Sequence, residues 1–381
     1  MQPGPDIIGK ENTVLIKGSL PFGRSISRVL VVQLGDIGDV VSATPAFRAI
    51  RENFPQAAVA VLVREGFGGL LEDDPGLDRI FDVRKRPGLL TDWILEPLRL
   101  IRELRRQRFD LVIDLRADDR GTYMSLVSGA SIRAAMRYGH MPWRDFFYTH
   151  LVVPPEPDKR IRGAAFQSLD VIRPLGIDTA DPVPRLYVSE ETLERVRHLL
   201  PERGAAGNAR GRVTINPFAR WKYKEWDYGK WAEVIRWMGK ETGYVPVLVG
   251  SRDEQEAAAR IAAAAGAVSL AGKTSLKELA ALLSLSAFHV GVDSAAPHIA
   301  AAVGTATITI YGPTDWRDWA PEGKNHRIIR PRRDCVPCRE KGCRGEGRSE
   351  CLEGLGTDEV IGEIEAFIRS LSQGAGGASG A

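Results

Sequence analysis

The sequence has few cysteines and no long hydrophobic run. Its four cysteines, among 381 residues, all lie between positions 335 and 351, which does not resemble the disulfide framework of a small secreted protein. Residues 1–23 lack the basic segment and long apolar run of a signal peptide. No apolar stretch approaches the roughly 20 residues that a membrane-spanning helix needs. These absences predict a soluble, cytoplasmic protein.

Several common catalytic fingerprints are also absent. There is no Gly-x-Gly-x-x-Gly for a dinucleotide, and Gly272-Lys273-Thr274 has Ala267 where a P-loop needs its first glycine. Neither His-Glu-x-x-His nor Gly-x-Ser-x-Gly occurs. Hydride transfer, P-loop phosphate chemistry, metalloproteolysis and α/β-hydrolase chemistry therefore lose their best evidence.

The charge is nearly balanced, with 52 Lys and Arg against 49 Asp and Glu and a formal net charge of +3. This excess is too small to indicate nucleic acid as a partner. The length exceeds the roughly 250–300 residues at which a single hydrophobic core stops growing. The chain therefore predicts more than one domain.

Strand-like and helix-like segments alternate in two blocks. The first block begins with a β-branched run at 28–34, and the second begins at 212–216 after a polar, proline-rich stretch. Such alternation is typical of βαβ units and a parallel sheet. We expect an α/β protein with these parts: an N-terminal extension (1–27), a first domain (28–185), a second domain (186–356), a C-terminal helix (357–371) and a disordered tail (372–381).

A glycine- and aspartate-rich turn follows the first predicted strand. It contains Gly35, Asp36, Gly38 and Asp39. Ligands of open α/β sheets bind at the carboxyl ends of the strands, and glycine permits a tight turn there. Either aspartate is a candidate general base. The alternative is that one of them caps a helix beginning near Val40, which the motif alone favours.

A basic loop follows the first strand of the second block. Its Arg220, Lys222 and Lys224 suit an anionic group such as a diphosphate. The alternative is a solvated loop in which Trp221 and Trp226 only pack. The sequence leaves these two interpretations equal.

A second strand-to-helix junction lies at Gly291–His298. Backbone N–H groups at Ser294–Ala296 and the positive end of the helix form a candidate anion site. Asp293 and His298 lie close enough in sequence to reach the same ligand. The alternative is that Asp293 or Ser294 is a helix cap, and capping is compatible with ligand binding.

The cysteines follow the last strand of the second block. Cys335, Cys338, Cys343 and Cys351 have the spacing of a tetrathiolate site for structural zinc, with iron as the alternative. Free thiols or disulfides are equally compatible with the spacing.

Three segments together resemble glycosyltransferase family 9, the ADP-heptose:lipopolysaccharide heptosyltransferases. They are VLVVQLGDIGDVVSATPAFRAIRENFP, INPFARWKYKEW and VGVDSAAPHIAAAVGTATITIYGPTD, and the resemblance extends over residues 28–368. It implies a GT-B fold, in which two Rossmann-like domains face a central cleft and a C-terminal helix lies near the hinge. It also implies inverting transfer of heptose from ADP-L-glycero-β-D-manno-heptose to a saccharide of the lipopolysaccharide inner core.

The resemblance also implies roles for individual residues. Asp39 matches the proposed general base, and Lys224 matches the lysine that binds the donor phosphate. A further set matches the donor loop or falls near positions that contact ribose and adenine: Asp293, Ser294, Ala295 and His298 for the loop, and Glu254 and Thr274 for the nucleoside. Arg220 stands where hydroxyl side chains often contact phosphate.

One position departs from the family pattern, because the family usually has glycine where Ala295 stands. If the site needs a positive φ or a very close phosphate, the methyl group interferes with donor binding. No catalytic metal is expected, since Lys224 and the helix end can offset the charge of ADP.

Two alternatives stay open: a transferase that uses another nucleotide sugar or a protein or O-antigen acceptor, and a non-catalytic nucleotide-sugar-binding module. An amphiphilic acceptor would place the protein peripherally on the cytoplasmic face of the inner membrane. The basic residues at 84–86 and between Arg99 and Arg108 then either attract anionic headgroups or form a solvated helix face.

Overall fold

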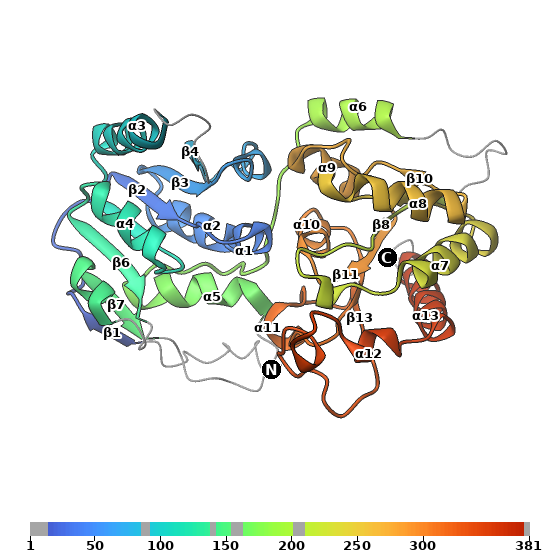
Figure 1. Cartoon of the computed structure of the whole chain (residues 1–381). Coiled ribbons are helices and arrows are strands. Elements are labelled where there is room, and N and C mark those ends of the chain that lie inside the picture. Colours follow the sequence, from blue (N-terminus) through green and yellow to red (C-terminus); the bar gives the residue numbers. More distant parts are fainter. Residues whose placement is uncertain (1–13, 85–91, 138–141, 154–162, 201–209, 377–381) are drawn as a thin grey trace, which may run out of the picture.

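The computed structural model describes residues 14–84, 92–137, 142–153, 163–200 and 210–376. In this part of the chain, two α/β domains stand side by side (Figure 1). The predicted α/β class with two sheets of parallel strands is confirmed.

The first domain contains a seven-stranded sheet. Every neighbouring pair is parallel except β1 and β7, which are antiparallel. The strands, in spatial order, are β1 (Val14–Lys17), β7 (His150–Val153), β6 (Ile132–Met136), β5 (Leu111–Asp114), β2 (Arg28–Val32), β3 (Ala58–Arg64) and β4 (Arg79–Val83). Its helices are α1 (Ile37–Ser42), α2 (Thr44–Asn53), α3 (Asp92–Gln107), α4 (Asp119–Val127) and α5 (Gly163–Ile172).

The continuous apolar run in β2 explains its central position. Val29 and Val31 belong to one buried cluster, whereas Leu30 and Val32 belong to the cluster on the opposite face. Because side chains of a strand alternate between faces, only an uninterrupted apolar run fits a strand that is covered on both sides.

The second domain contains a six-stranded, wholly parallel sheet. The strands, in spatial order, are β10 (Val268–Ser269), β9 (Tyr244–Leu248), β8 (Gly211–Asn216), β11 (Phe288–Val292), β12 (Thr307–Ile310) and β13 (His326–Ile329). Its helices are α6 (Glu190–Leu199), α7 (Tyr228–Glu241), α8 (Gln255–Ala265), α9 (Leu276–Ser284), α10 (Ala295–Ala302), α11 (Trp316–Trp319), α12 (Glu350–Glu353) and α13 (Thr357–Gly376).

The N-terminal boundary differs from the prediction. Residues 14–17 of the expected extension (1–27) form β1, which pairs with β7 at the edge of the first sheet. An edge strand needs one partner only, so its short Val-Leu-Ile run gave little signal. The helix after β2 also begins earlier than predicted, at Ile37 rather than near Val40.

The position of the C-terminal helix near a hinge stays a prediction, and the structure shows which elements the helix contacts. Helix α13 packs against α7 and β13 within the second domain, because Val360, Ile364 and Phe367 form a stripe that joins that domain's apolar cluster. The helix also continues to Gly376, so the predicted disorder is wrong for 372–376. Residues 377–381 lie outside the described residues.

Each sheet has a point at which its strand order reverses. In the first sheet the chain runs outward from β2 through β3 to β4, then starts again on the other side with β5. In the second sheet the reversal lies between β8 and β11. Ligands of open α/β sheets bind at such points. Helix α1 of the first domain contacts α10 of the second, so the two points lie on facing sides of the region where the domains meet (Figure 1). This interdomain region is called the gap below.

Candidate active site

The turn after β2 holds Asp39 in a fixed position. Asp36 is the N-cap of α1, and its backbone N–H donates to Asp39 Oδ2 at 2.8 Å. A Cβ at Gly35 would lie 2.3 Å from the same oxygen, so any larger residue would displace the carboxylate. The predicted capping role and the predicted functional role therefore fall on one motif.

A neighbouring strand supplies a cation to this carboxylate. Arg116, which follows β5, donates from Nη1 to Asp39 Oδ2 at 2.6 Å. Both of these hydrogen bonds to Asp39 are accepted by Oδ2. The Asp39 side chain is only 16% exposed, and its charge acts on His298 of the second domain.

Asp36 links the two domains. Its Oδ1 accepts hydrogen bonds from Arg64 at 2.8 Å and from Arg220 at 2.5 Å. Arg64 ends β3 in the first domain, whereas Arg220 belongs to the basic loop of the second. The ion pair between Asp36 and Arg220 therefore spans the interdomain gap.

The point at which the strand order of the second sheet reverses, its switch point, gathers polar side chains from the ends of β8 and β11. These side chains are called the Lys224 group. Asn216 Nδ2 donates to Ser294 Oγ at 3.0 Å, and Lys224 Nζ donates to Asp293 Oδ2 at 2.7 Å. The side chains of Asp293 and Lys224 are 7% and 20% exposed, respectively. Lys222 lies outside this group, since it bonds to Glu225 and Tyr228 in its own loop.

Helix α10 points its N-terminus at this group. Ser294 is the N-cap, and Ala295 is the first helical residue. Ala295 is not among the described residues with positive φ, so the methyl group causes no backbone strain here. The N–H groups of the first helical turn and the positive helix end remain a candidate anion site beside Lys224.

His298 joins the two halves of the site. It lies in α10, and a Cβ at Gly38 of α1 would be 3.4 Å from its ring carbon Cδ2. The imidazole interacts electrostatically with Asp293, Asp39 and Lys224. Burial is the main reason that the pKa of His298 is lowered, so the ring is neutral at neutral pH.

Two predicted donor contacts lie farther along the same sheet edge. Glu254 follows β9, and its carboxylate accepts a 2.6 Å hydrogen bond from the N–H of Ser251. Thr274 follows β10, beyond β9, and is half-buried. Thr274, Glu254 and the Lys224 group follow neighbouring strands in the order β10, β9, β8 and β11. Glu254 and Thr274 therefore belong to the same sheet edge as the Lys224 group, whereas Asp39 belongs to the other domain.

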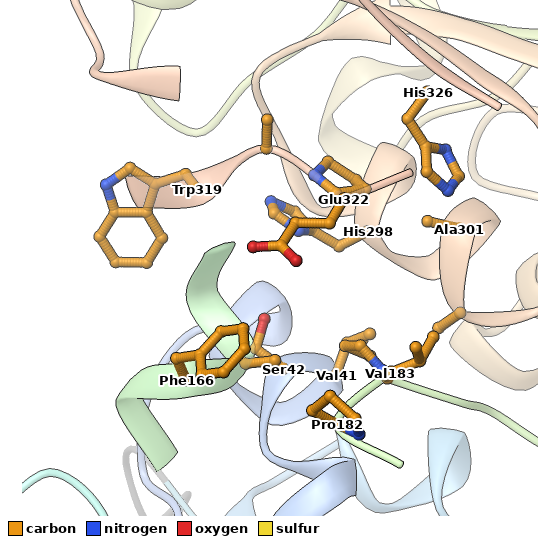
Figure 2. Close-up of a pocket in the computed structure, with 15 residues that line it drawn as sticks. Val41, Ser42, Phe166, Pro182, Val183, His298, Ala301, Trp319, Glu322 and His326 are labelled. Atoms are coloured by element: carbon orange, nitrogen blue, oxygen red, sulfur yellow. The ribbon is translucent and has the colours of Figure 1, made fainter. Parts of the chain in front are cut away.

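An apolar cavity of about 90 Å³ opens behind the contact between α1 and α10. Ser42 and Phe166 of the first domain face His298, Trp319 and Glu322 of the second across it (Figure 2). The linker residues 182–184 form part of its wall. Sequence patterns did not indicate this cavity, because it exists only where the two domains meet.

The four cysteines are free thiols in one segment. Burial raises the pKa of Cys351, and the thiols of Cys343, Cys335 and Cys338 lie close enough to raise it further. Within the described residues, however, no three His, Cys, Asp or Glu side chains are arranged to hold a metal ion. The predicted structural metal stays a prediction, and this conformation does not present a closed tetrathiolate site.

Sequence reasoning missed Arg64, Arg116 and Asn216. Arg64 and Asn216 are the last residues of β3 and β8, and Arg116 lies two residues beyond the end of β5. Polar residues of α/β proteins meet ligands at these carboxyl ends. That signal was available for Asn216, since it opens the basic loop. The roles of Arg64 and Arg116 depend on which strands are neighbours in the sheet. Local sequence patterns do not predict that order.

No helix among the described residues has the length and apolar character to cross a membrane. In the predicted basic patch, Arg84 pairs with Glu65 and Arg105 donates to the carbonyl of Val127. Arg99 and Arg102 of α3 are exposed. Residues 85 and 86 lie outside the described part.

Comparison with known proteins agrees with this architecture. The family model for glycosyltransferase family 9 (heptosyltransferase) matches residues 97–348. Lipopolysaccharide heptosyltransferase 3 of Escherichia coli is 30% identical over 294 residues, which cover 74% of this chain and 84% of that protein.

Solved structures show the same fold. The Escherichia coli ADP-heptose lps heptosyltransferase II superposes with a TM-score of 0.70 at 23% identity, over 91% of this chain and 99% of that one. The Escherichia coli heptosyltransferase WaaC with ADP-2-deoxy-2-fluoro heptose gives 0.67 at 22% identity, over 89% and 99%. The two-domain fold is thus the GT-B fold. Because the family model matches residues 97–348, more than half of the chain, the chain belongs to glycosyltransferase family 9, the heptosyltransferases.

Proposed function

We propose that this enzyme transfers heptose from ADP-L-glycero-β-D-manno-heptose to a saccharide of the lipopolysaccharide inner core, with inversion at the anomeric carbon. The observation that carries the proposal is the meeting of Asp39 with the Lys224 group around His298. A carboxylate base and a cationic diphosphate site face one another across the gap, as a single displacement requires.

Asp39 acts as the general base. Its Oδ1 takes the proton of the acceptor hydroxyl as that oxygen forms a bond to the anomeric carbon of the donor. The bonds from Arg116 and from the N–H of Asp36 to Oδ2 fix the carboxylate plane. Such fixation keeps the base aligned with the hydroxyl, and alignment contributes a large part of the rate acceleration in reactions of this kind.

The second domain binds and stabilises the leaving group. As the bond between the anomeric carbon and the diphosphate breaks, negative charge grows on ADP. Lys224, Arg220 and the N-terminus of α10 offset this charge. Because these groups supply positive charge directly, we propose that the reaction needs no divalent metal. In this proposal, neutral His298 contributes a hydrogen bond to the leaving group and no positive charge.

The nucleoside lies along the edge towards β9 and β10 in this proposal. Glu254 and Thr274 follow those strands in turn, so a nucleotide with its diphosphate at Lys224 extends its ribose and base towards them. The 2.6 Å bond between Glu254 and the N–H of Ser251 occupies one carboxylate oxygen. The other oxygen is the one that we assign to the ribose.

The acceptor is amphiphilic, which places the enzyme peripherally on the cytoplasmic face of the inner membrane in this proposal. Arg99, Arg102 and Arg106, all exposed on α3, are suited to anionic headgroups. Co-sedimentation with phosphatidylglycerol vesicles should fall steeply with salt. Binding that is absent at low salt, or that is insensitive to salt, contradicts the electrostatic attachment.

The function is tested by incubating the purified protein with ADP-heptose and a lipid A–Kdo acceptor. We expect release of ADP and a product heavier by one heptose, and the rate of both should fall by about 100-fold or more in Asp39→Ala. Asp178→Ala, at an exposed position outside the gap, is the matched control and should behave as wild type.

Parallel reactions with UDP-, GDP- and other ADP-sugars test the donor. Turnover with one of those sugars, and none with ADP-heptose, would show that ADP-heptose is not the donor. If wild type and Asp39→Ala bind the donor with equal affinity and neither turns it over with any acceptor, the protein is a binding module and not an enzyme.

A further inference from the structure

A buried carboxylate lies beneath the turn that presents Arg116. Asp114, the last residue of β5, is fully buried. Its Oδ1 accepts hydrogen bonds from the backbone N–H of Arg116 at 3.0 Å and of Ala117 at 2.9 Å. The side chain therefore holds both amides of the turn from the protein interior.

The turn is held in a conformation that needs such support. Ala117 has φ of +51°, in the left-handed region, which costs a residue with a side chain about 1 kcal/mol or more. On the outer side Arg144 Nη1 donates to the carbonyl of Ala117 at 2.8 Å. Hydrogen bonds thus hold the turn from two directions.

The second oxygen of Asp114 is fixed as well. Tyr148, which is also buried, donates from its hydroxyl to Oδ2 at 2.6 Å and lies 3.0 Å from Thr122 Oγ1. Gly121 of α4 packs directly on the carboxylate, since a Cβ there would come within 2.4 Å of Oδ2. The carboxylate consequently has one position available to it.

This arrangement forms a continuous chain of bonds to the site. Asp114 holds the backbone of Arg116, and the Arg116 guanidinium donates to Asp39 Oδ2 at 2.6 Å. Asp114 itself makes no contact with the gap. We propose that Asp114 is a positioning residue, which sets the location of Arg116 and through it the orientation of the Asp39 carboxylate.

The proposal rests on the proposed role of Asp39, and it predicts a graded series at one position. Asparagine keeps an oxygen acceptor for the two amides and can donate to the Tyr148 oxygen, so Asp114→Asn should retain kcat within about threefold. Serine offers a shorter acceptor that still forms this kind of turn, and it should be intermediate. Asp114→Ala leaves both amides unpaired and should lower kcat by about 10- to 100-fold, the size expected for a small misplacement of a reacting group.

Two measurements separate positioning from general damage. The KM for ADP-heptose and the affinity for ADP should change less than twofold in the whole series, because Lys224 and α10 belong to the other domain. In addition, Asp114→Ala combined with Arg116→Ala should be no slower than Arg116→Ala alone, since both act through the same guanidinium.

The proposal is overturned if kcat is independent of the residue at 114, if Asn is as impaired as Ala, or if the two substitutions add in full. Should Asp114→Ala fail to fold, the Asn and Ser variants still decide the series.

Hydrogen-exchange mass spectrometry of the peptide 114–121 gives a readout independent of turnover. The amides of 116 and 117 should exchange faster in the Ser variant and stay protected in the Asn variant. If wild type transfers no sugar, the proposed function fails while exchange still reports the turn. If exchange rises with no change in kcat, the positioning role alone fails.

Discussion

The two switch points have the same topology but different chemistry. At the first, between β2 and β5, side-chain and backbone donors fix one carboxylate, Asp39. At the second, between β8 and β11, a lysine and a helix N-terminus surround a space suited to an anion. In the proposed function, the same arrangement of strands provides an acid–base site in one domain and a diphosphate site in the other.

The two regions also differ in how they are supported. The first depends on the interior, where Asp114 and Tyr148 hold the turn from below. The second depends on bonds within the site itself, such as those from Lys224 to Asp293 and from Asn216 to Ser294. Variants should therefore separate turnover from donor affinity according to domain.

The largest expected effect concerns the buried support of the first region. Burial raises the pKa of Asp114 from 3.8 to about 6, so the folded protein keeps this proton over a pH range in which the unfolded chain has lost it. The group therefore destabilises the fold as pH rises from about 4 to about 6, by at most about 3 kcal/mol. Asp114→Asn cannot ionise and lacks this loss.

Urea unfolding of wild type and Asp114→Asn at pH 4, 5, 6 and 7 measures this effect. The free energy of unfolding of wild type relative to the variant should fall across that range. Titrations elsewhere in the chain cancel in the difference. Parallel curves for the two proteins would show that Asp114 is not held with a raised pKa.

The next effect concerns the second region. Lys224→Ala removes a charged partner of the diphosphate and should weaken ADP binding about 10- to 100-fold. Lys222→Ala is the matched control, because Lys222 belongs to the same loop but bonds to Glu225 and is 67% exposed. Calorimetric titration with ADP compares them, and equal losses in both variants would contradict the assignment of Lys224.

Two glycines of one turn should differ in sensitivity. A Cβ at Gly35 would lie 2.3 Å from Asp39 Oδ2, whereas a Cβ at Gly38 would lie 3.4 Å from the nearest atom of His298. Gly35→Ala should therefore lower kcat by about 10-fold or more through displacement of the base, with the affinity for ADP unchanged. Gly38→Ala should have the smaller effect on kcat. The reverse order would mean that the contact between α1 and α10 matters more than the position of Asp39.

The smallest effect is expected from chelation. Because Lys224, Arg220 and α10 supply the positive charge, EDTA should leave the initial rate within about twofold of the untreated rate. Metal analysis of protein purified under reducing conditions tests the cysteine segment separately. One zinc or iron per chain would support the structural metal site. Protein that is stable without bound metal would contradict it. A large loss of initial rate on chelation would contradict the metal-independent reaction.

The sequence predicts well those features that depend on neighbouring residues. The turn from Gly35 to Asp39 is a local motif, so its place after a strand and its link to a helix could be predicted. The loop around Lys224 and the junction at Asp293 are local in the same way, and topology brings them together at one sheet edge.

Features that depend on distant contacts could not be predicted in this way. The bond between Arg116 and Asp39 joins residues 77 positions apart and requires β5 to lie beside β2. The support of that bond by Asp114 and Tyr148 also depends on this packing. Short edge strands such as β1 were missed for a related reason, because one partner strand places little demand on their sequence.

The central claim is that the first domain supplies the general base and the second domain binds the donor. Its most direct test is the rate of transfer at saturating ADP-heptose, measured in parallel for Asp39→Ala and Lys224→Ala. Saturation compensates for weak binding but not for a missing base. We therefore expect Asp39→Ala to remain slower than wild type by about 100-fold or more, while Lys224→Ala recovers a substantial part of the wild-type rate. Recovery of Asp39→Ala at high donor concentration would contradict the account.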